Sequence, residues 1–385
     1  MNKRLPFLLI TLYFLPWGIQ CLVNNFIPVY VDSLPFASAQ TVGDVVGLGA
    51  LITTVSQLTW SFFAGKAKNK SNLLALSLLL LSVFSLLFLI KEITKPTLFI
   101  FVILFYSTYM AHQPIIDTIA SENYSETRFS FGFYRSFASL GYAIFALLLV
   151  LLPSDDISMF FLYSAILALL SSFCAKSVPG ATTSSVNKKR NTRIFNSSFI
   201  RFLIYTLVLF FCSSSFSSFF SVYYTSSEHL GGSISAFSIL ICVFAIAEWL
   251  LVMLFARLSE RLGATLSFLF IPISGVVRVF TVFLAETPAA ASLSFVGCAL
   301  WFGILWASVT PYIRSIVPPE GGSFAHGVWG VASSGIGSFL GSFFSGRFVE
   351  RFGMKSLFLF LTFVLISLAL ATPLLIPPQK RRSVS

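Results

Sequence analysis

Residues 73–90 read LLALSLLLLSVFSLLFLI, and residues 99–110 read FIFVILFYSTYM. Neither run contains a charged residue, and neither alternates apolar with polar residues as the strands of an outer-membrane barrel do. Because about 20 apolar residues cross the ~30 Å hydrocarbon core, continuous runs of this kind indicate membrane-spanning α-helices. The whole chain of 385 residues has the same character, with 56% hydrophobic and 10% charged residues. This composition predicts an all-α integral membrane protein and excludes a soluble enzyme.

Apolar blocks recur between polar breaks along the whole chain and predict twelve transmembrane helices. The first block follows Met1–Arg4 but has no small-residue cleavage site after it, so we expect a retained helix rather than a secretory signal. The expected spans are 5–31, 41–65, 72–90, 98–118, 132–153, 157–178, 199–224, 232–256, 264–285, 289–316, 323–345 and 354–376.

The longest polar connection divides the spans six and six. This pattern predicts a six-helix bundle over 1–178, a basic cytoplasmic linker over 179–198, a second six-helix bundle over 199–376 and a basic cytoplasmic tail over 377–385. Two six-span halves favour an internal repeat, a plan that recurs in secondary carriers. We therefore expect two pseudo-symmetric bundles.

The net charge of +11 is a topology signal. If the N-terminus is cytoplasmic, most of the 25 Lys and Arg residues lie in cytoplasmic segments, while acidic residues favour the outside. We expect a multi-pass protein of the cytoplasmic (inner) membrane with both termini cytoplasmic. The basic cytoplasmic surface predicts contact with anionic lipids rather than with nucleic acid.

Sequence motifs for a cofactor are missing. The chain has no phosphate-binding loop and no H-E-x-x-H pattern, and its five cysteines lie in apolar spans without a C-x-x-C spacing. We expect no cofactor, metal or disulfide, no enzymatic activity, a proton gradient as the driving force, and a monomer whose partners are a small solute, protons and lipids.

Ionisable side chains inside the hydrocarbon cost about 2.5–3.5 kcal/mol on insertion scales and mark pathways or coupling sites by default. Four candidates are Asp117 in span 4, Arg135 in span 5, Glu248 in span 8 and Arg278 in span 9. Asp117 and Arg135 lie near cytoplasmic helix ends, where a charge is less costly, so hydropathy leaves a structural role open for both.

Glu248 lies in the apolar run 241–255, where its carboxyl has little water and is suited to carry a proton. Arg278 keeps its proton in proteins and must be held by a carboxylate, by carbonyls or by a solute anion. A coupling role for both residues and a purely structural pair between them remain the two alternatives.

Other polar residues within the spans are candidates for solute binding. Gln20 and Asn24 are four residues apart on one face of span 1, and Gln57 lies in span 2. Amides of this kind bind polar solutes but also bridge helices. Trp301 in span 10 is a candidate cavity residue, or alternatively a member of an interfacial aromatic belt.

Polar turns follow the second span of each half. One comprises residues 65–72 and begins at Gly65, and the other comprises residues 256–263 and contains Glu260, Arg261 and Gly263. We expect both to act as conformational gating loops.

The twelve spans, the basic central linker and these polar turns resemble the major facilitator superfamily. The turn pattern Gly-x-x-x-Asp-Arg-x-Gly is kept in part by Glu260, Arg261 and Gly263, whereas Asn69 and Lys70 replace its charged pair in the first half. The segment 131–143, which reads FGFYRSFASLGYA, resembles the opening of span 5 in the branch of lactose permease, nucleoside-proton symporters and the phenylpropionate permease.

The resemblance implies roles for the four intramembrane charges. Asp117 and Arg135 correspond to an acid and an arginine that hold sugar in lactose permease, Glu248 to its span 8 acid, and Arg278 to its span 9 arginine near the proton site. The span 10 histidine and glutamate of lactose permease have no counterpart in residues 300–306.

These observations predict a secondary transporter that moves a sugar, nucleoside or aromatic acid by alternating access as a proton symporter. Asp117, Arg135, Gln20, Asn24, Gln57 and Trp301 would bind the solute, and Glu248 and Arg278 would couple its movement to protons. The alternatives are a drug-type proton-coupled exporter of the same fold and a ligand sensor that does not transport.

Overall fold

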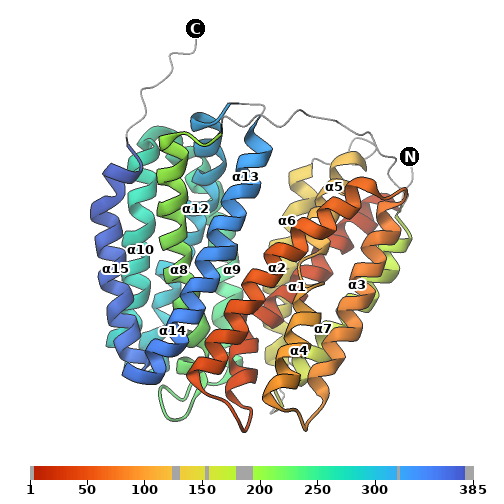
Figure 1. Cartoon of the computed structure of the whole chain (residues 1–385), viewed down its shortest axis with the longest axis horizontal. Helices are drawn as coiled ribbons and strands as arrows, with labels where there is room; N and C mark the ends of the chain where they lie inside the picture. Colours follow the sequence, from red (N-terminus) through yellow and green to blue (C-terminus); the bar gives the residue numbers. More distant parts are fainter. Residues whose placement is uncertain (1–3, 124–130, 152–155, 179–193, 319–320, 378–385) are drawn as a thin grey trace. The chain divides into compact units, whose positions relative to one another are not determined.

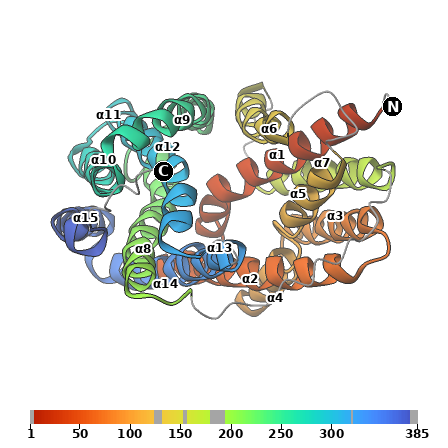
Figure 2. The ribbon, with the colours of Figure 1, turned by 90° about the horizontal axis from the view of Figure 1, so that it is seen from above.

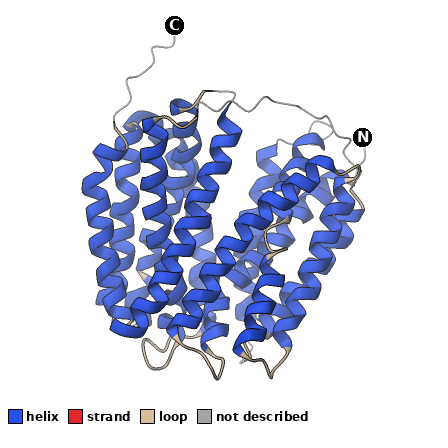
Figure 3. Ribbon diagram, in the orientation of Figure 1, coloured by secondary structure: helices blue, strands red, loops and turns tan. Residues whose placement is uncertain are grey.

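The structure is a computed structural model that describes residues 4–123, 131–151, 156–178, 194–318 and 321–377. Over these ranges the secondary structure is helical, joined by loops and turns (Figure 3). Ten helices are long and apolar enough to cross a membrane, and Lys95–Tyr106 is a shorter apolar helix. The all-α membrane fold expected from the sequence is confirmed.

The helices follow the order of the predicted spans (Figure 1). Their bounds are α1 Leu5–Asp32, α2 Ala39–Lys66, α3 Lys70–Leu86 with the short η1 Leu87–Leu89, α4 Lys95–Tyr106, α5 His112–Asn123, α6 Phe131–Leu151, α7 Met159–Lys176, α8 Ser197–Thr225, α9 Ile234–Leu262, α10 Ala264–Leu284, α11 Pro288–Ser292, α12 Ser294–Ile316, α13 Gly322–Gly330, the π-helix η4 Val331–Gly337, α14 Ser338–Phe352 and α15 Met354–Leu375.

Short polar residues fix where several helices begin. The side chains of Ser38 and Asn69 accept hydrogen bonds from the backbone N–H groups of Thr41 and Asn72, both at 3.1 Å, at the starts of α2 and α3. Asn196 does the same for α8 at 2.8 Å. Each bond satisfies one of the N–H groups that the first turn of a helix leaves unpaired.

The chain divides into two compact units by its internal contacts. One comprises 1–186 with 233–245, and the other comprises 187–232 with 246–385. In the first unit α1 packs on α6 and α7, and α3 packs on α7; in the second α8 packs on η4, α14 and α15, and α10 packs on α15 (Figure 2). The two units therefore share one packing pattern. The first span of each unit packs on its fifth and sixth spans, and the third span packs on the sixth.

Two glycines allow the same close approach in each unit. A Cβ on Gly141 of α6 would overlap the carbonyl oxygen of Phe14 on α1, and a Cβ on Gly341 of α14 would overlap the carbonyl oxygen of Phe211 on α8. The next residue makes a cross-helix hydrogen bond in both cases, from Asn25 to the hydroxyl of Tyr142 at 2.8 Å and between the hydroxyls of Ser214 and Ser342 at 2.6 Å.

The fourth span differs from the single helix expected over 98–118. It is two helices, α4 and α5, separated by residues 107–111, with Met110 at φ 59°. Pro114 has no N–H to donate to the carbonyl of Met110 and its ring disfavours a continuous helix there. Apolar composition does not record this interruption.

The eleventh span and the expected turn at 256–263 also differ from the prediction. Residues 322–352 contain the π-helix η4 between α13 and α14. Helix α9 continues to Leu262, because residues 257–262 contain no helix-breaking residue, and it ends at Gly263 with φ 80°. The predicted domain boundaries remain a prediction, since the linker residues 179–193 lie outside the described ranges.

Candidate functional site

The ion pair between Asp117 and Arg135 joins α5 to α6. Nη1 of Arg135 lies 2.7 Å from both carboxylate oxygens of Asp117. The hydroxyl of Tyr13 on α1 donates a third hydrogen bond to Oδ1 of Asp117, also at 2.7 Å. The side chains of Arg135 and Asp117 remain 44% and 31% exposed, so a solute can reach the charged atoms.

The break in span 4 places Asp117 at this position. The carbonyl of Ser107 is free of its usual helical partner because the N–H of Ala111 bonds to Thr108 instead, at 3.1 Å. Two side chains of α2 replace that partner: Ser56 donates its hydroxyl at 2.5 Å and Trp60 its indole N–H at 2.9 Å. Helix α2 therefore satisfies the backbone carbonyl that the break between α4 and α5 leaves without a helical partner.

The predicted amides lie on α1 and α2, and two of them contact residues of the fourth span. Asn24 accepts a hydrogen bond from the hydroxyl of Tyr109 at 2.8 Å, and Gln20 makes no hydrogen bond with a residue that the structure describes. Nε2 of Gln57 lies 3.4 Å from Oε1 of Gln113 and 3.5 Å from the carbonyl of Met110, both long contacts. Gln20 and Gln57 therefore have spare hydrogen-bonding capacity.

Aromatic rings connect the ion pair with His112 in the first turn of α5. Tyr13 lies 5.5 Å from Trp17 between ring centroids, and Trp17 lies 5.8 Å from the imidazole of His112. His112 is buried, and neither ring nitrogen has a hydrogen-bond partner among the described residues. The surface around Asp117 thus combines charges, amides and aromatic rings, which together can bind a solute that has both hydroxyl groups and an apolar face.

Glu248 and Arg278 occupy α9 and α10 but form no ion pair with each other. The guanidinium of Arg278 lies over the ring of Phe216 at 4.4 Å and within 3.4 Å of the hydroxyl of Ser217. Glu248 makes no hydrogen bond or ion pair with a described residue. The alternative of a direct structural pair between them is therefore not what the structure contains.

Trp301 packs against α10 one helical turn before Arg278, whereas the predicted gating residues lie at helix ends. Trp301 is 2% exposed and fills the space left by the missing side chain of Gly275 on α10. Gly65 lies in the last turn of α2, and Gly263 connects α9 to α10. Glu260 and Arg261 belong to the last turn of α9, and their side chains lie outside the described atoms.

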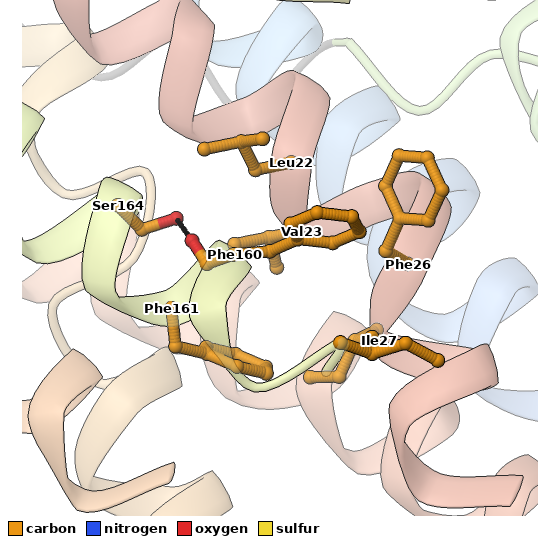
Figure 4. A pocket seen from close by; sticks show the side chains of 8 residues that line it. Leu22, Val23, Phe26, Ile27, Phe160, Phe161 and Ser164 are labelled. Carbon is orange, nitrogen blue, oxygen red and sulfur yellow. Dashed lines mark hydrogen bonds between the residues drawn. The ribbon is translucent and has the colours of Figure 1, made fainter. Parts of the chain in front are cut away.

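A small pocket between α1 and α7 does not fit a polar solute. It is lined mainly by apolar side chains, among them Leu22, Phe26 and Phe160 (Figure 4). The one hydroxyl in its wall, that of Ser164, is already bonded to the carbonyl of Phe160 at 2.9 Å. The α1 residues that line the pocket begin at Leu22, nine residues or roughly 14 Å along the helix from Tyr13.

Sequence reasoning missed three tyrosines that hydrogen-bond the polar residues of this surface: Tyr13, Tyr109 and Tyr142. A signal for Tyr13 was present, because Tyr13, Trp17, Gln20 and Asn24 follow the spacing i, i+4, i+7, i+11 and so share one face of a helix. Tyrosine counts as apolar in a hydropathy scan, although its hydroxyl is a strong donor.

Comparison with known proteins agrees with this architecture. The chain is 24% identical over 342 residues to the Bacillus subtilis (strain 168) protein named uncharacterized transporter YwbF, covering 86% of this chain and 83% of that protein. The crystal structure of the nucleoside transporter NupG matches with a TM-score of 0.84 and 16% identity, over 98% of this chain and 100% of that chain.

A bacterial homologue of the human lysosomal transporter Spinster, in an inward-facing and occupied conformation, matches with a TM-score of 0.75 and 12% identity, over 98% of both chains. At these identities the solved structures show a shared fold. The model of the MFS_1 like family matches residues 7–360, which is most of the chain. This protein therefore belongs to the MFS_1 like family of membrane transporters.

Proposed function

We propose that this protein is a proton symporter that moves a small organic solute, either a sugar, a nucleoside or an aromatic acid, across the cytoplasmic membrane by alternating access. The observation that carries the proposal is the half-exposed ion pair of Asp117 and Arg135, with Tyr13 bonded to the same carboxylate. Intramembrane charges that served only packing would be buried and fully paired, whereas these two remain accessible.

The donors and acceptors of this pair match a hydroxylated solute. The carboxylate of Asp117 accepts hydrogen bonds from hydroxyl groups, and the guanidinium of Arg135 donates them in a planar fork. Trp17 packs on Tyr13 and offers an aromatic face for a base or ring. The structural relative NupG is a nucleoside transporter, which adds support for including nucleosides.

Proton coupling is assigned to Glu248. Its carboxyl lies on α9 among apolar residues without a described hydrogen-bond or ion-pair partner. A carboxyl in this setting can take a proton from the outside and release it to the cytoplasm when the transporter changes conformation.

The experiment that tests the proposal records pH in a weakly buffered suspension of de-energised cells that express the protein. Sugars, nucleosides and aromatic acids are added one at a time, with labelled uptake for the acids because their own permeation moves protons. We expect transient external alkalinisation with one solute class. If no compound changes the external pH and no labelled acid is taken up, although the protein is verified in the membrane, symport would be contradicted.

Glu248→Gln should abolish uphill accumulation and the alkalinisation while sparing solute exchange, because glutamine has the shape of the protonated acid but cannot release a proton. The matched control is Glu286→Gln, which removes an exposed carboxyl in the loop before α11 and should transport normally. Normal accumulation by Glu248→Gln would exclude this carboxyl as the coupling group.

A further inference from the structure

Arg278 is a buried cation without an acidic partner among the residues that the structure describes. The side chain is 8% exposed. Its guanidinium contacts the ring of Phe216 at 4.4 Å and the ring of Phe302 at 6.0 Å. Nη2 of Arg278 donates a long hydrogen bond, 3.4 Å, to the hydroxyl of Ser217.

These contacts do not compensate for burying the charge. A cation–π contact recovers less free energy than is lost by burying an ion without a partner. Arginine cannot escape this cost by losing its proton. Arg278 therefore has free capacity to bind an anion that none of the described residues around it supplies.

The backbone holds this guanidinium in a fixed place. A Cβ on Gly297 of α12 would lie 2.6 Å from the carbonyl oxygen of Ser274 and 2.9 Å from the Cα of Arg278, so α10 and α12 touch backbone to backbone there. The rings of Phe216 and Phe302 lie beside the guanidinium, so its N–H edges are what remains for an oxyanion. That geometry suits a carboxylate, which arginine binds through two parallel N–H bonds.

The four predicted intramembrane charges have a net charge of zero only while Glu248 is ionised. Asp117 and Arg135 neutralise each other at 2.7 Å. Glu248 on α9 and Arg278 on α10 form no ion pair with each other. When Glu248 carries the transported proton, one positive charge remains, at Arg278.

We propose that Arg278 is the binding subsite for the anionic group of the transported solute, which is a monoanionic organic acid with an apolar or aromatic body. The identity of the solute as cargo rests on the proposed transport function, whereas the anion subsite does not. Protonation of Glu248 leaves the solute carboxylate as the counter-charge of Arg278. Deprotonation returns a competing carboxylate to the same region, so solute and proton leave together.

Cys298 is a built-in probe of this subsite. In a variant whose other four cysteines are serine, the thiol is reacted with an anionic sulfonate-bearing methanethiosulfonate and with a cationic ammonium-bearing one, each rate divided by its rate with a free thiol. Removing one nearby charge changes the local electrostatic potential, which acts on the anionic and cationic reagents in opposite directions. Arg278→Gln should therefore lower the anionic-to-cationic rate ratio about tenfold or more.

Arg347→Gln is the matched control, because it removes an arginine of α14 that also lies over a phenylalanine ring, at 3.4 Å from Phe343, in another part of the same unit. Its rate ratio should stay unchanged. An unchanged ratio in Arg278→Gln, or no reaction of Cys298 with either reagent, would overturn the anion subsite.

The solute class is tested by protection of Cys298 with paired compounds, 3-phenylpropionate against 3-phenylpropanamide and glucuronate against glucose. We expect one acid to slow the modification and its neutral partner to have no effect, with protection lost in Arg278→Gln. Protection that is equal within each pair, or absent with both acids, would overturn the assignment of an organic acid.

The outcomes separate this inference from the proposed function. If the modification-rate ratio depends on Arg278 but no solute changes the external pH, the anion subsite would be supported and proton symport would be contradicted. Alkalinisation driven by a neutral sugar or nucleoside and lost in Glu248→Gln would establish symport and overturn the anionic substrate class.

Discussion

Tyr13 shows how one hydroxyl organises the charged residues of the first unit. It donates to the same carboxylate oxygen that Arg135 contacts, so Asp117 has two donors from two different helices. With both donors in place the carboxylate is fixed before a solute arrives. Fixing it in advance lowers the ordering cost that the solute would otherwise meet on binding.

Tyr13→Phe should therefore raise the KM for the solute about tenfold with little change in maximal rate. A hydrogen bond to a charged group contributes about 1.5–3 kcal/mol, and a tenfold change corresponds to about 1.4 kcal/mol. The measurement is initial uptake rate against solute concentration.

Tyr30→Phe is the control for this substitution. It removes a hydroxyl from the same helix, one that donates to the carbonyl of Phe88 at 3.1 Å, away from the ion pair. We expect its KM to match that of the unmodified protein. Equal KM values for both variants and the unmodified protein would show that Tyr13 does not prepare the binding site.

The candidate site could be predicted from the sequence only for groups whose chemistry stands out against an apolar background. Asp117 and Arg135 were identified as charges within spans and through the resemblance of 131–143, and the structure brings them together at 2.7 Å. Tyr13 and Tyr109 could not be found in the same way, since their hydroxyls matter through their partners. The carbonyl of Ser107 belongs to the backbone and has no sequence signal of its own.

At the scale of elements, hydropathy located the helices but not their interruptions. Spans 4 and 11 were expected as single helices, whereas residues 107–111 interrupt the first and η4 winds seven residues of the second as a π-helix. Among the described residues, neither α4 and α5 nor the segment 322–352 belongs to the ten helices that are long and apolar enough to cross a membrane. Hydrogen-bonding pattern, rather than polarity, separates a continuous helix from an interrupted one.

A second Glu-Arg-x-Gly sequence connects α14 to α15 in the same way that residues 260–263 connect α9 to α10. It comprises residues 350–353, and the glycines share the same conformation, Gly263 at φ 80° and ψ 166° and Gly353 at φ 80° and ψ 165°. Only glycine adopts this region readily, because a Cβ would clash with the backbone. The two glycines therefore reverse the chain between adjacent helices without a longer loop.

Gly353→Ala should destabilise the protein by about 1–3 kcal/mol, since alanine at this φ and ψ is strained even though the space around the residue is open. Gly327→Ala is the control, because Gly327 lies in α13 with open space and no positive φ, and alanine favours helix. The measurement is thermal unfolding of the purified protein in detergent. Equal midpoints for the two variants would show that Gly353 carries no conformational constraint.

For the whole molecule, the sequence predicted the class of fold because the membrane restricts the choices. In lipid a spanning segment must satisfy its own backbone hydrogen bonds, so an apolar run of the right length indicates a helix. The repeat was predicted from span number, but its physical basis, the contact of Gly141 with Phe14 repeated by Gly341 with Phe211, is a backbone approach that hydropathy does not encode.

Orientation in the membrane is a property of the whole chain and follows from its distribution of charge. The loop between α2 and α3 carries Lys68 and should be cytoplasmic, whereas the loop between α8 and α9 carries Ser227 and should face outward. Both residues are exposed. In a background where the half-buried Cys174 and Cys242 are serine, a membrane-impermeant maleimide should label Ser227→Cys in intact cells.

Under the same conditions Lys68→Cys should be labelled only after the membrane is permeabilised, because the positive-inside bias retains this loop in the cytoplasm. The pair controls for reactivity, since both cysteines are exposed in short loops and both should react equally once the membrane is open. Labelling of Lys68→Cys in intact cells, with Ser227→Cys protected, would invert the topology.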